Sequence, residues 1–110
     1  MEFLNKVEIR GVVGNVSVTD VLGRKLARLA VAVATQHAYK DAEGTPVIDV
    51  EWHNVRAWDG ENIAPLEDLQ KGDAVLIEGR LRYARVTNAE GVTYSAAEII
   101  ANKLLIIKGI

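Results

Sequence analysis

The chain has 110 residues, the size of a single small domain with one hydrophobic core. It is 49% hydrophobic and 25% charged, which excludes a disordered tail and a collagen-like fibre. The absence of cysteine excludes disulfide scaffolds, thiolate metal sites and cysteine nucleophiles, and the formal net charge of −2 does not by itself indicate a nucleic-acid partner.

The sequence shows no pattern of membrane insertion or secretion. No apolar run approaches the roughly 20 residues that a membrane-spanning helix needs, and residues 1–6 lack the layout of a signal peptide. We therefore expect one soluble, cytoplasmic domain over residues 1–110 that makes no membrane contact.

Short runs of β-branched residues between turn residues predict a mostly β protein. The first predicted strand covers 5–14 and continues to Val18, with Gly11 and Gly14 indicating a bend or bulge. The second covers 25–35, where large side chains alternate with alanines, which favours a strand whose small face packs closely against another element. Its alanine content also suits a helix, so the helical alternative stays open.

One helical segment interrupts the later strands. A third predicted strand covers 48–58, and the apolar spacing in 61–71 predicts the helix. Strands four and five are predicted at 73–86 and 92–101, followed by the apolar tail 102–110. Three strands, one helix and two strands is the order of the oligonucleotide/oligosaccharide-binding (OB) fold. The predicted fold class is therefore all-β: a five-stranded Greek-key OB barrel with one short helix between strands three and four.

The third predicted strand carries the most informative residues. At period two, one face over about 20 Å presents Trp52, Asn54, Arg56 and Trp58. Indole and guanidinium groups are poor core residues because each needs a polar partner, but they suit single-stranded nucleic acid, whose bases stack on the rings while the cation contacts phosphates. Trp58, beside a turn, is expected to be exposed. For Trp52, a stacking platform and a subunit contact stay equally open.

Basic residues on the predicted strands are further candidates for phosphate contacts. They are Arg80, Arg82, Arg85, Lys6, Arg10 and Lys40, the last three being the weaker candidates. In strand four, Arg80 and Arg82 share a face, whereas Tyr83 lies on the other. Such cations often only keep a surface soluble, so this interpretation depends on cations and aromatic rings occurring together.

Catalysis is the least favoured interpretation. Asp49, Glu51 and His53 share a face of strand three and could form an acid–base or metal set. The sequence supplies no nucleophile, phosphate-cradling glycine loop or open metal position beside them. We therefore expect no catalytic residue, no metal and no cofactor, and a metal-dependent hydrolase is the weakest alternative.

Several stretches of the chain form a specific combination. They are Asn5-Lys6-Val7 with Ile9, Gly11 and Gly14; Leu29 to Thr35; Glu51-Trp52-His53-Asn54-Val55; Lys71-Gly72-Asp73 through Ile77-Glu78-Gly79-Arg80-Leu81-Arg82; and Tyr94 with Glu98-Ile99. In this combination the chain resembles the bacterial single-stranded DNA-binding protein family over essentially its whole length.

The resemblance implies an OB barrel that assembles as a homotetramer and binds single-stranded DNA without sequence preference. The family's stacking aromatics fall on Tyr39, Trp52 and Trp58. Its subunit-interface roles fall on His53 and on strand one, with Val7 and Ile9. The resemblance also implies roles in DNA replication, recombination and repair, and a cytoplasmic, nucleoid-associated location.

The sequence departs from the family pattern in two places. Val86 stands where the family has a fourth aromatic, and whether Tyr83 substitutes for it stays open. Family members typically continue into a flexible linker and an acidic tip that recruits replication and repair proteins, whereas this sequence stops at Ile110. Two alternatives stay open: the chain is a tail-less form, or the sequence given omits the tail. In both cases the sequence offers no acidic tip on which to base partner recruitment. A barrel of net charge −2 is expected to bind more weakly, or with more salt sensitivity, than a strongly basic one.

Two rival functions stay open. A dimeric primosome-type replication accessory protein, built on the same barrel, would bind single strands while bridging replication proteins. A protein-interaction barrel without a nucleic-acid role would place Trp52 and Trp58 in an interface. The mass in solution and the response of tryptophan emission to oligonucleotide distinguish these alternatives.

Overall fold

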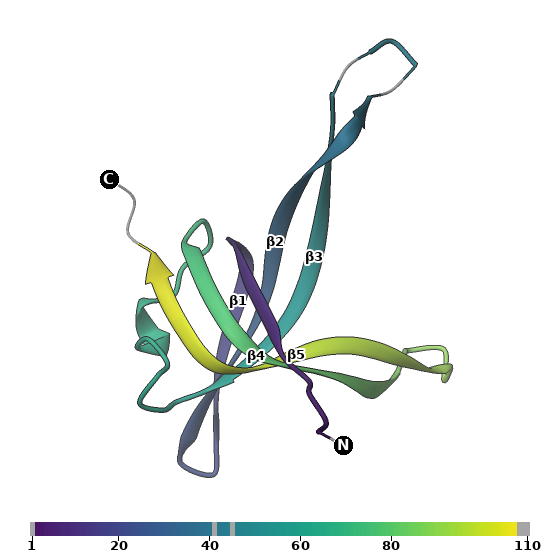
Figure 1. Ribbon diagram of the computed structural model, residues 1–110. Helices are drawn as coiled ribbons and strands as arrows, with labels where there is room; N and C mark the ends of the chain where they lie inside the picture. Colours follow the sequence, from purple (N-terminus) through teal and green to yellow (C-terminus); the bar gives the residue numbers. More distant parts are fainter. Residues whose placement is uncertain (1, 41, 45, 108–110) are drawn as a thin grey trace.

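Five β-strands form a closed barrel in the computed structural model of the chain (Figure 1), in the order β1-β2-β3-β5-β4. The strands are β1 (Val7–Val21), β2 (Arg24–Lys40), β3 (Pro46–Trp58), β4 (Ala74–Thr87) and β5 (Thr93–Ile107). The structure describes residues 2–40, 42–44 and 46–107, without the side chains of 35–40 and 46–48. The all-β OB barrel expected from the order of the elements is confirmed.

Strand β1 closes the barrel because it pairs with two neighbouring strands. Its first half pairs with β4 and its second half with β2, both antiparallel. The register with β2 shifts between Val13 and Asn15, so Gly14 lies in a bulge, as the sequence predicts. A side chain at Gly11 would overlap the backbone of Ala32 in β2, which explains why the close approach of the two strands requires glycine there.

The alanine-rich segment is a strand, not a helix. Leu29 and Val31 of β2 point into the barrel and are buried, whereas Ala30 and Ala32 lie on its outer surface. The small-residue face therefore lies outside the core.

The core fills the barrel and is closed at one end by the segment between β3 and β4. Leu66 and Leu69 of that segment are buried in the same apolar cluster as Val31, Val55 and Ile77. Burying such side chains is worth about 1.5–3 kcal/mol each, so this short segment contributes substantially to the stability of the barrel.

The helix predicted over 61–71 is wrong in extent, because the helical element there is one 3₁₀ turn, η1 (Leu66–Asp68). Pro65 precedes it with extended geometry, φ −52° and ψ 122°. Upstream, the backbone is held against β5, where the N–H of Ala64 donates to the carbonyl of Leu104 at 2.8 Å. The apolar spacing that suggested one helical face thus reflects separate contacts with the barrel.

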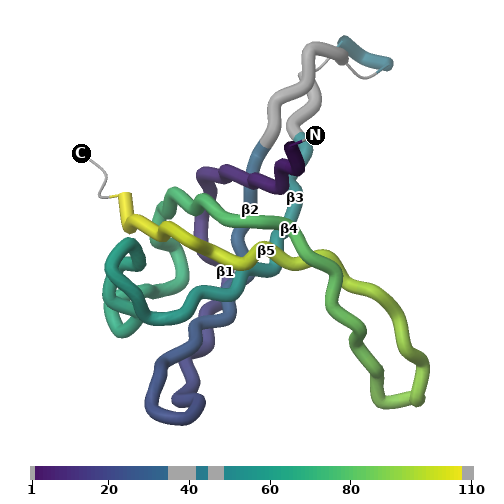
Figure 2. Tube along the Cα trace, turned by 60° about the horizontal axis from the view of Figure 1, so that its bottom comes forward, coloured from purple at the N-terminus to yellow at the C-terminus, as the bar shows by residue number. Residues whose placement is uncertain are grey.

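Three hairpins, β1–β2, β2–β3 and β4–β5, extend beyond the barrel as arms (Figures 1 and 2). Strand β5 is longer than the predicted 92–101, because residues 103–107 also pair with residues 74–78 of β4. The β2–β3 and β4–β5 arms diverge from the place where β3 and β5 pair in parallel, at Arg56 opposite Ile100. This junction positions the candidate site.

Candidate functional site

The outer face of β3 carries the four residues that the period-two pattern groups together. Their inward neighbours Val55 and Ala57 are 2% and 0% exposed. Trp52, Asn54, Arg56 and Trp58 therefore form an outer row along the barrel surface. A ligand lying along this row would meet rings, an amide and a cation in sequence.

Trp52 carries the more exposed of the two indole rings in the outer row, with 61% of its surface exposed. Its cross-strand neighbour in β2 is Ala32, and beyond it the six-membered edge of the indole lies where a Cβ of Gly14 in β1 would be. The small outer side chains of two strands thus form a floor under the ring. This leaves the remaining surface of the indole available to a flat partner.

Trp58 is half-buried, so the expectation of an exposed ring is wrong. The guanidinium carbon of Arg24 lies 5.1 Å from the ring centroid, and its Nη2 donates to the carbonyl of Asp59 at 3.2 Å. The cross-strand neighbour of Trp58 is Leu26, which is 2% exposed although it lies outside the core cluster. Trp58 therefore shields an outward-facing leucine and is itself shielded by a cation.

A groove of about 360 Å³ lies between the outer faces of β1–β3 and the β4–β5 arm. Its polar lining comes from all five strands: Asn15, Ser17, Arg28, Asn54, Arg56, Arg85 and Glu98. Arg28 and Arg56 are cross-strand neighbours, so two cations lie side by side on its floor. We call this feature the arginine groove.

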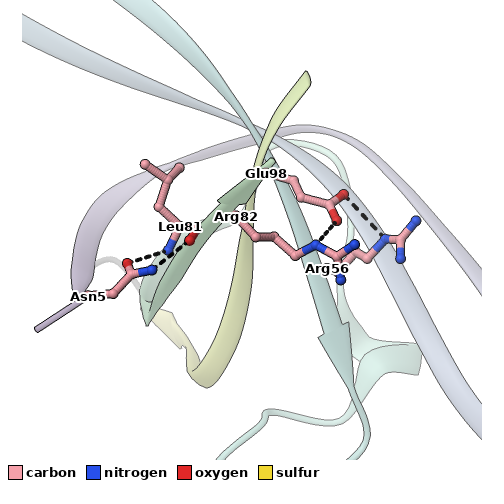
Figure 3. A network of polar contacts seen from close by, with 5 residues as sticks. All are labelled: Asn5, Arg56, Leu81, Arg82 and Glu98. Atoms are coloured by element: carbon pink, nitrogen blue, oxygen red, sulfur yellow. Dashed lines mark hydrogen bonds and ion pairs between the residues drawn. The ribbon is translucent and has the colours of Figure 1, made fainter. Parts of the chain in front are cut away.

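Glu98 of β5 joins two arginines from neighbouring strands at the edge of the groove (Figure 3). Its carboxylate lies 3.4 Å from Nε of Arg56 and 3.1 Å from Nε of Arg82, and its side chain is only 12% exposed. In both ion pairs the guanidinium nitrogen nearest the carboxylate is Nε, so Glu98 shares its charge between the two arginines.

The backbone next to Arg82 is fixed by the segment before β1. The side-chain amide of Asn5 donates to the carbonyl of Leu81 at 2.8 Å, and the N–H of Leu81 donates to Asn5 Oδ1 at 2.9 Å (Figure 3). This pair of bonds replaces strand pairing at that point and holds Arg82 at the groove.

The other predicted cations lie outside the centre of the groove. Arg80 is exposed on the same face of β4 as Arg82, whereas Arg85 starts from the opposite face and reaches the lining. Lys6 makes an ion pair with Glu78 at 3.5 Å. Arg10 is exposed on the first half of β1, which pairs with β4. The structure therefore brings Arg56, Arg82 and Arg85 together and leaves Lys6 and Arg10 apart from them.

For five of the predicted site residues, the structure of the single chain does not test the predicted role. The side chains of Tyr39 and Lys40 lie outside the described residues. Val7 and Ile9 are half-buried against this chain's own core, and His53 is half-buried opposite Val31, so their interface roles stay predictions.

The described residues also show what the site does not contain. Within them, no three His, Cys, Asp or Glu side chains are grouped as metal ligands would be, and Asp49, Glu51 and His53 form no such group. The described part of the chain also contains no helix that is long and apolar enough to cross a membrane.

Sequence reasoning missed four polar members of the groove as site residues: Asn15, Ser17, Arg28 and Glu98. The two charged ones are the most informative. Arg28 has the signal that identified Arg56, an outward position at period two in a strand. Glu98 has no comparable local signal, because its position between two arginines depends on β3, β4 and β5 meeting.

Comparison with known proteins matches most of this chain. The model of the single-strand binding protein family matches residues 4–107. A single-stranded DNA-binding protein of Xanthomonas campestris pv. campestris is 34% identical over 106 residues, covering 96% of this chain and 62% of that protein. Single-stranded DNA-binding protein 1 of Xylella fastidiosa strain 9a5c is 30% identical over 105 residues, covering 94% and 77%. This chain spans about three fifths of the length of the first curated relatives.

Solved structures agree with the fold. A Plasmodium falciparum SSB complex with ssDNA superposes with a TM-score of 0.81 at 22% identity, covering 98% of both chains. A deletion mutant of the single-stranded DNA binding protein from Thermus aquaticus superposes with a TM-score of 0.66 at 27% identity, covering 96% of this chain and 51% of that one.

Proposed function

Because this chain belongs to the single-strand binding protein family, we propose that its barrel binds single-stranded DNA without sequence preference. The observation that carries the proposal is the exposed indole of Trp52, which lies on the same outer row as Asn54 and Arg56 of the arginine groove. Bases stack on aromatic rings whatever their sequence, and guanidinium groups neutralise the phosphates that accompany them. The relatives that match this chain are named for the same binding activity.

In this proposal the site works by binding alone. Trp52 and Tyr39 stack on bases, and the half-buried Trp58 offers a smaller stacking surface. Phosphates are held by Arg28, Arg56, Arg80, Arg82 and Arg85. Asn54 contacts the strand, and Lys6, Arg10 and Lys40 contribute weakly. The chain is then not an enzyme, and it protects single strands during DNA replication, recombination and repair in the cytoplasm, at the nucleoid.

We further propose a homotetramer whose subunit contacts include His53, Val7 and Ile9. All three are only half-buried in the single chain, so a partner subunit has apolar and imidazole surface left to cover. A dimeric mass in solution would instead favour the primosome-type alternative.

The test is tryptophan emission during titration with oligothymidine, with duplex DNA of equal length as the control. We expect quenching by the single strand alone, weaker at high salt, and most of it absent in Trp52→Phe because Trp58 is shielded. If the tryptophan emission does not change on adding the single strand, or changes equally with the duplex, the proposal is contradicted and a protein-interaction barrel is favoured.

A further inference from the structure

The β4–β5 arm continues the surface of the arginine groove toward its tip. The two strands pair without a register shift from Gly79 opposite Ala101 to Thr87 opposite Thr93. The alternation of side chains is therefore unbroken along this arm, and the face of each residue follows from its position.

One face of the arm is the groove face. Glu98 lies on it, because it contacts Arg56 of the outer row, and Ala96 lies on it two residues away and lines the groove. The next residue on this face is Tyr94, whose cross-strand neighbour is Val86. Tyr94 thus stands on the same surface as the arginines, about 13 Å along β5 from Glu98.

Tyr94 is accessible there, with 49% of its surface exposed. Directly opposite residues in an antiparallel pair have Cβ atoms about 5 Å apart, so the branched side chain of Val86 supports one side of the ring. The remaining ring surface is free to stack. The arrangement resembles that of Trp52, an aromatic ring supported by a smaller neighbour on the adjacent strand.

Tyr83 provides an internal comparison on the same arm. It is 67% exposed, but its neighbour across the strands is Ala97, on the face opposite Glu98. That face continues the barrel interior and is exposed only because the arm projects beyond the barrel. Ala97 and Arg85 on that face also reach the groove lining. Tyr83 is therefore a tyrosine of similar exposure on the opposite face of the arm from Tyr94.

We propose that Tyr94 is a base-stacking residue of the site, positioned on the β4–β5 arm, whereas Trp52 lies on the barrel surface at the base of the β2–β3 arm. The two arms diverge from the junction of β3 and β5, where the arginines lie (Figures 1 and 2). A single strand bound at the arginines reaches Trp52 on the barrel surface and Tyr94 on the β4–β5 arm. This inference rests on the proposed binding of single-stranded DNA and extends its site toward the tip of that arm.

The first test compares Tyr94→Ala with Tyr83→Ala in the full chain, by oligothymidine affinity at fixed salt. We expect Tyr94→Ala to lose about tenfold in affinity, consistent with one stacked base. Tyr83→Ala stays within about twofold of the wild type, and Tyr94→Phe retains binding because the ring acts rather than the hydroxyl. Thermal unfolding of each variant checks that the barrel is intact.

A second test needs no variant. Photocrosslinking of the wild-type protein to a 5-iododeoxyuridine oligonucleotide is expected to label the peptide that contains Tyr94. This inference alone is overturned if the wild type binds single-stranded DNA, no crosslink forms at the Tyr94 peptide, and Tyr94→Ala binds as tightly as the wild type. A wild type that binds no single strand overturns the proposed function as well.

Discussion

Trp52 and Trp58 are the same side chain on one face of one strand, yet their surroundings differ. Trp52 lies on a floor of Ala32 and Gly14 and is mostly exposed, whereas Trp58 lies between Leu26 and Arg24. Replacement by alanine should therefore separate two roles.

We expect Trp52→Ala to reduce oligonucleotide affinity by about tenfold while changing the free energy of unfolding by less than about 1 kcal/mol. Trp58→Ala uncovers Leu26, so it should lower the free energy of unfolding by about 1–3 kcal/mol. Urea titration and oligothymidine binding measure the two quantities. Equal stability losses in both variants would contradict the difference in shielding.

Glu98 should weaken DNA binding while it stabilises the barrel. It lies against Nε of Arg56 and of Arg82, so it reduces the positive potential that a phosphate meets. Glu98→Gln keeps the shape and removes the charge, so we expect several-fold tighter oligonucleotide binding at low salt. Because Arg56 loses its partner, the free energy of unfolding should fall by about 1–2 kcal/mol. Weaker binding by a folded Glu98→Gln protein would show that its charge supports the site instead.

The bulge at Gly14 in β1 makes room for the indole ring of Trp52, which belongs to β3 and reaches across β2. A Cβ at Gly14 would overlap the indole of Trp52, so Gly14→Ala should lift the ring from its floor. We expect a loss of about 1–2 kcal/mol in unfolding free energy, a shift in tryptophan emission and weaker oligonucleotide binding. The matched control is Gly60→Ala, because a Cβ there has its nearest neighbours at an ordinary 3.9 Å. An emission spectrum that Gly14→Ala leaves unchanged would contradict the contact.

The turn η1 is tied to β2 by an exposed ion pair between Lys25 and Glu67. The hydrogen bond from Lys25 lowers the pKa of the Glu67 carboxyl, and the same bond raises the pKa of Lys25 above its ordinary 10.5. The stabilisation is therefore present at neutral pH. It is lost as pH falls through the lowered carboxyl pKa, and again as pH rises through the raised ammonium pKa.

We expect the difference in thermal midpoint between wild type and Glu67→Gln to be small at neutral pH, since both groups are exposed, and to shrink below about pH 4. Asp68→Asn, one residue away and outside the ion pair, is the control. A difference that grows in acid would contradict the assignment.

At the scale of the whole molecule, regular strands were predictable and their meeting points were not. Period-two alternation is local, so the outer row from Trp52 to Trp58 follows from the sequence of β3 alone. The succession of strands follows from the runs of β-branched residues between turns. The extent of η1 is set by hydrogen bonds to β5, and the shielding of Trp58 by an arginine from β2. The arginine groove combines side chains from all five strands. These features depend on tertiary contacts that no window of sequence contains.

The whole chain has a net charge of −2, yet its binding should depend strongly on salt, because the local field at the groove decides which counterions are released. Five phosphate contacts, from Arg28, Arg56, Arg80, Arg82 and Arg85, would give a log–log slope of affinity against salt of about −3.5 per subunit for a single strand. Arg28→Gln should reduce that slope by about 0.7. Arg10 lies apart from the groove, so Arg10→Gln should reduce the slope much less. A slope near zero would mean that stacking alone holds the strand, and equal reductions in both variants would mean that the groove does not concentrate the phosphate contacts.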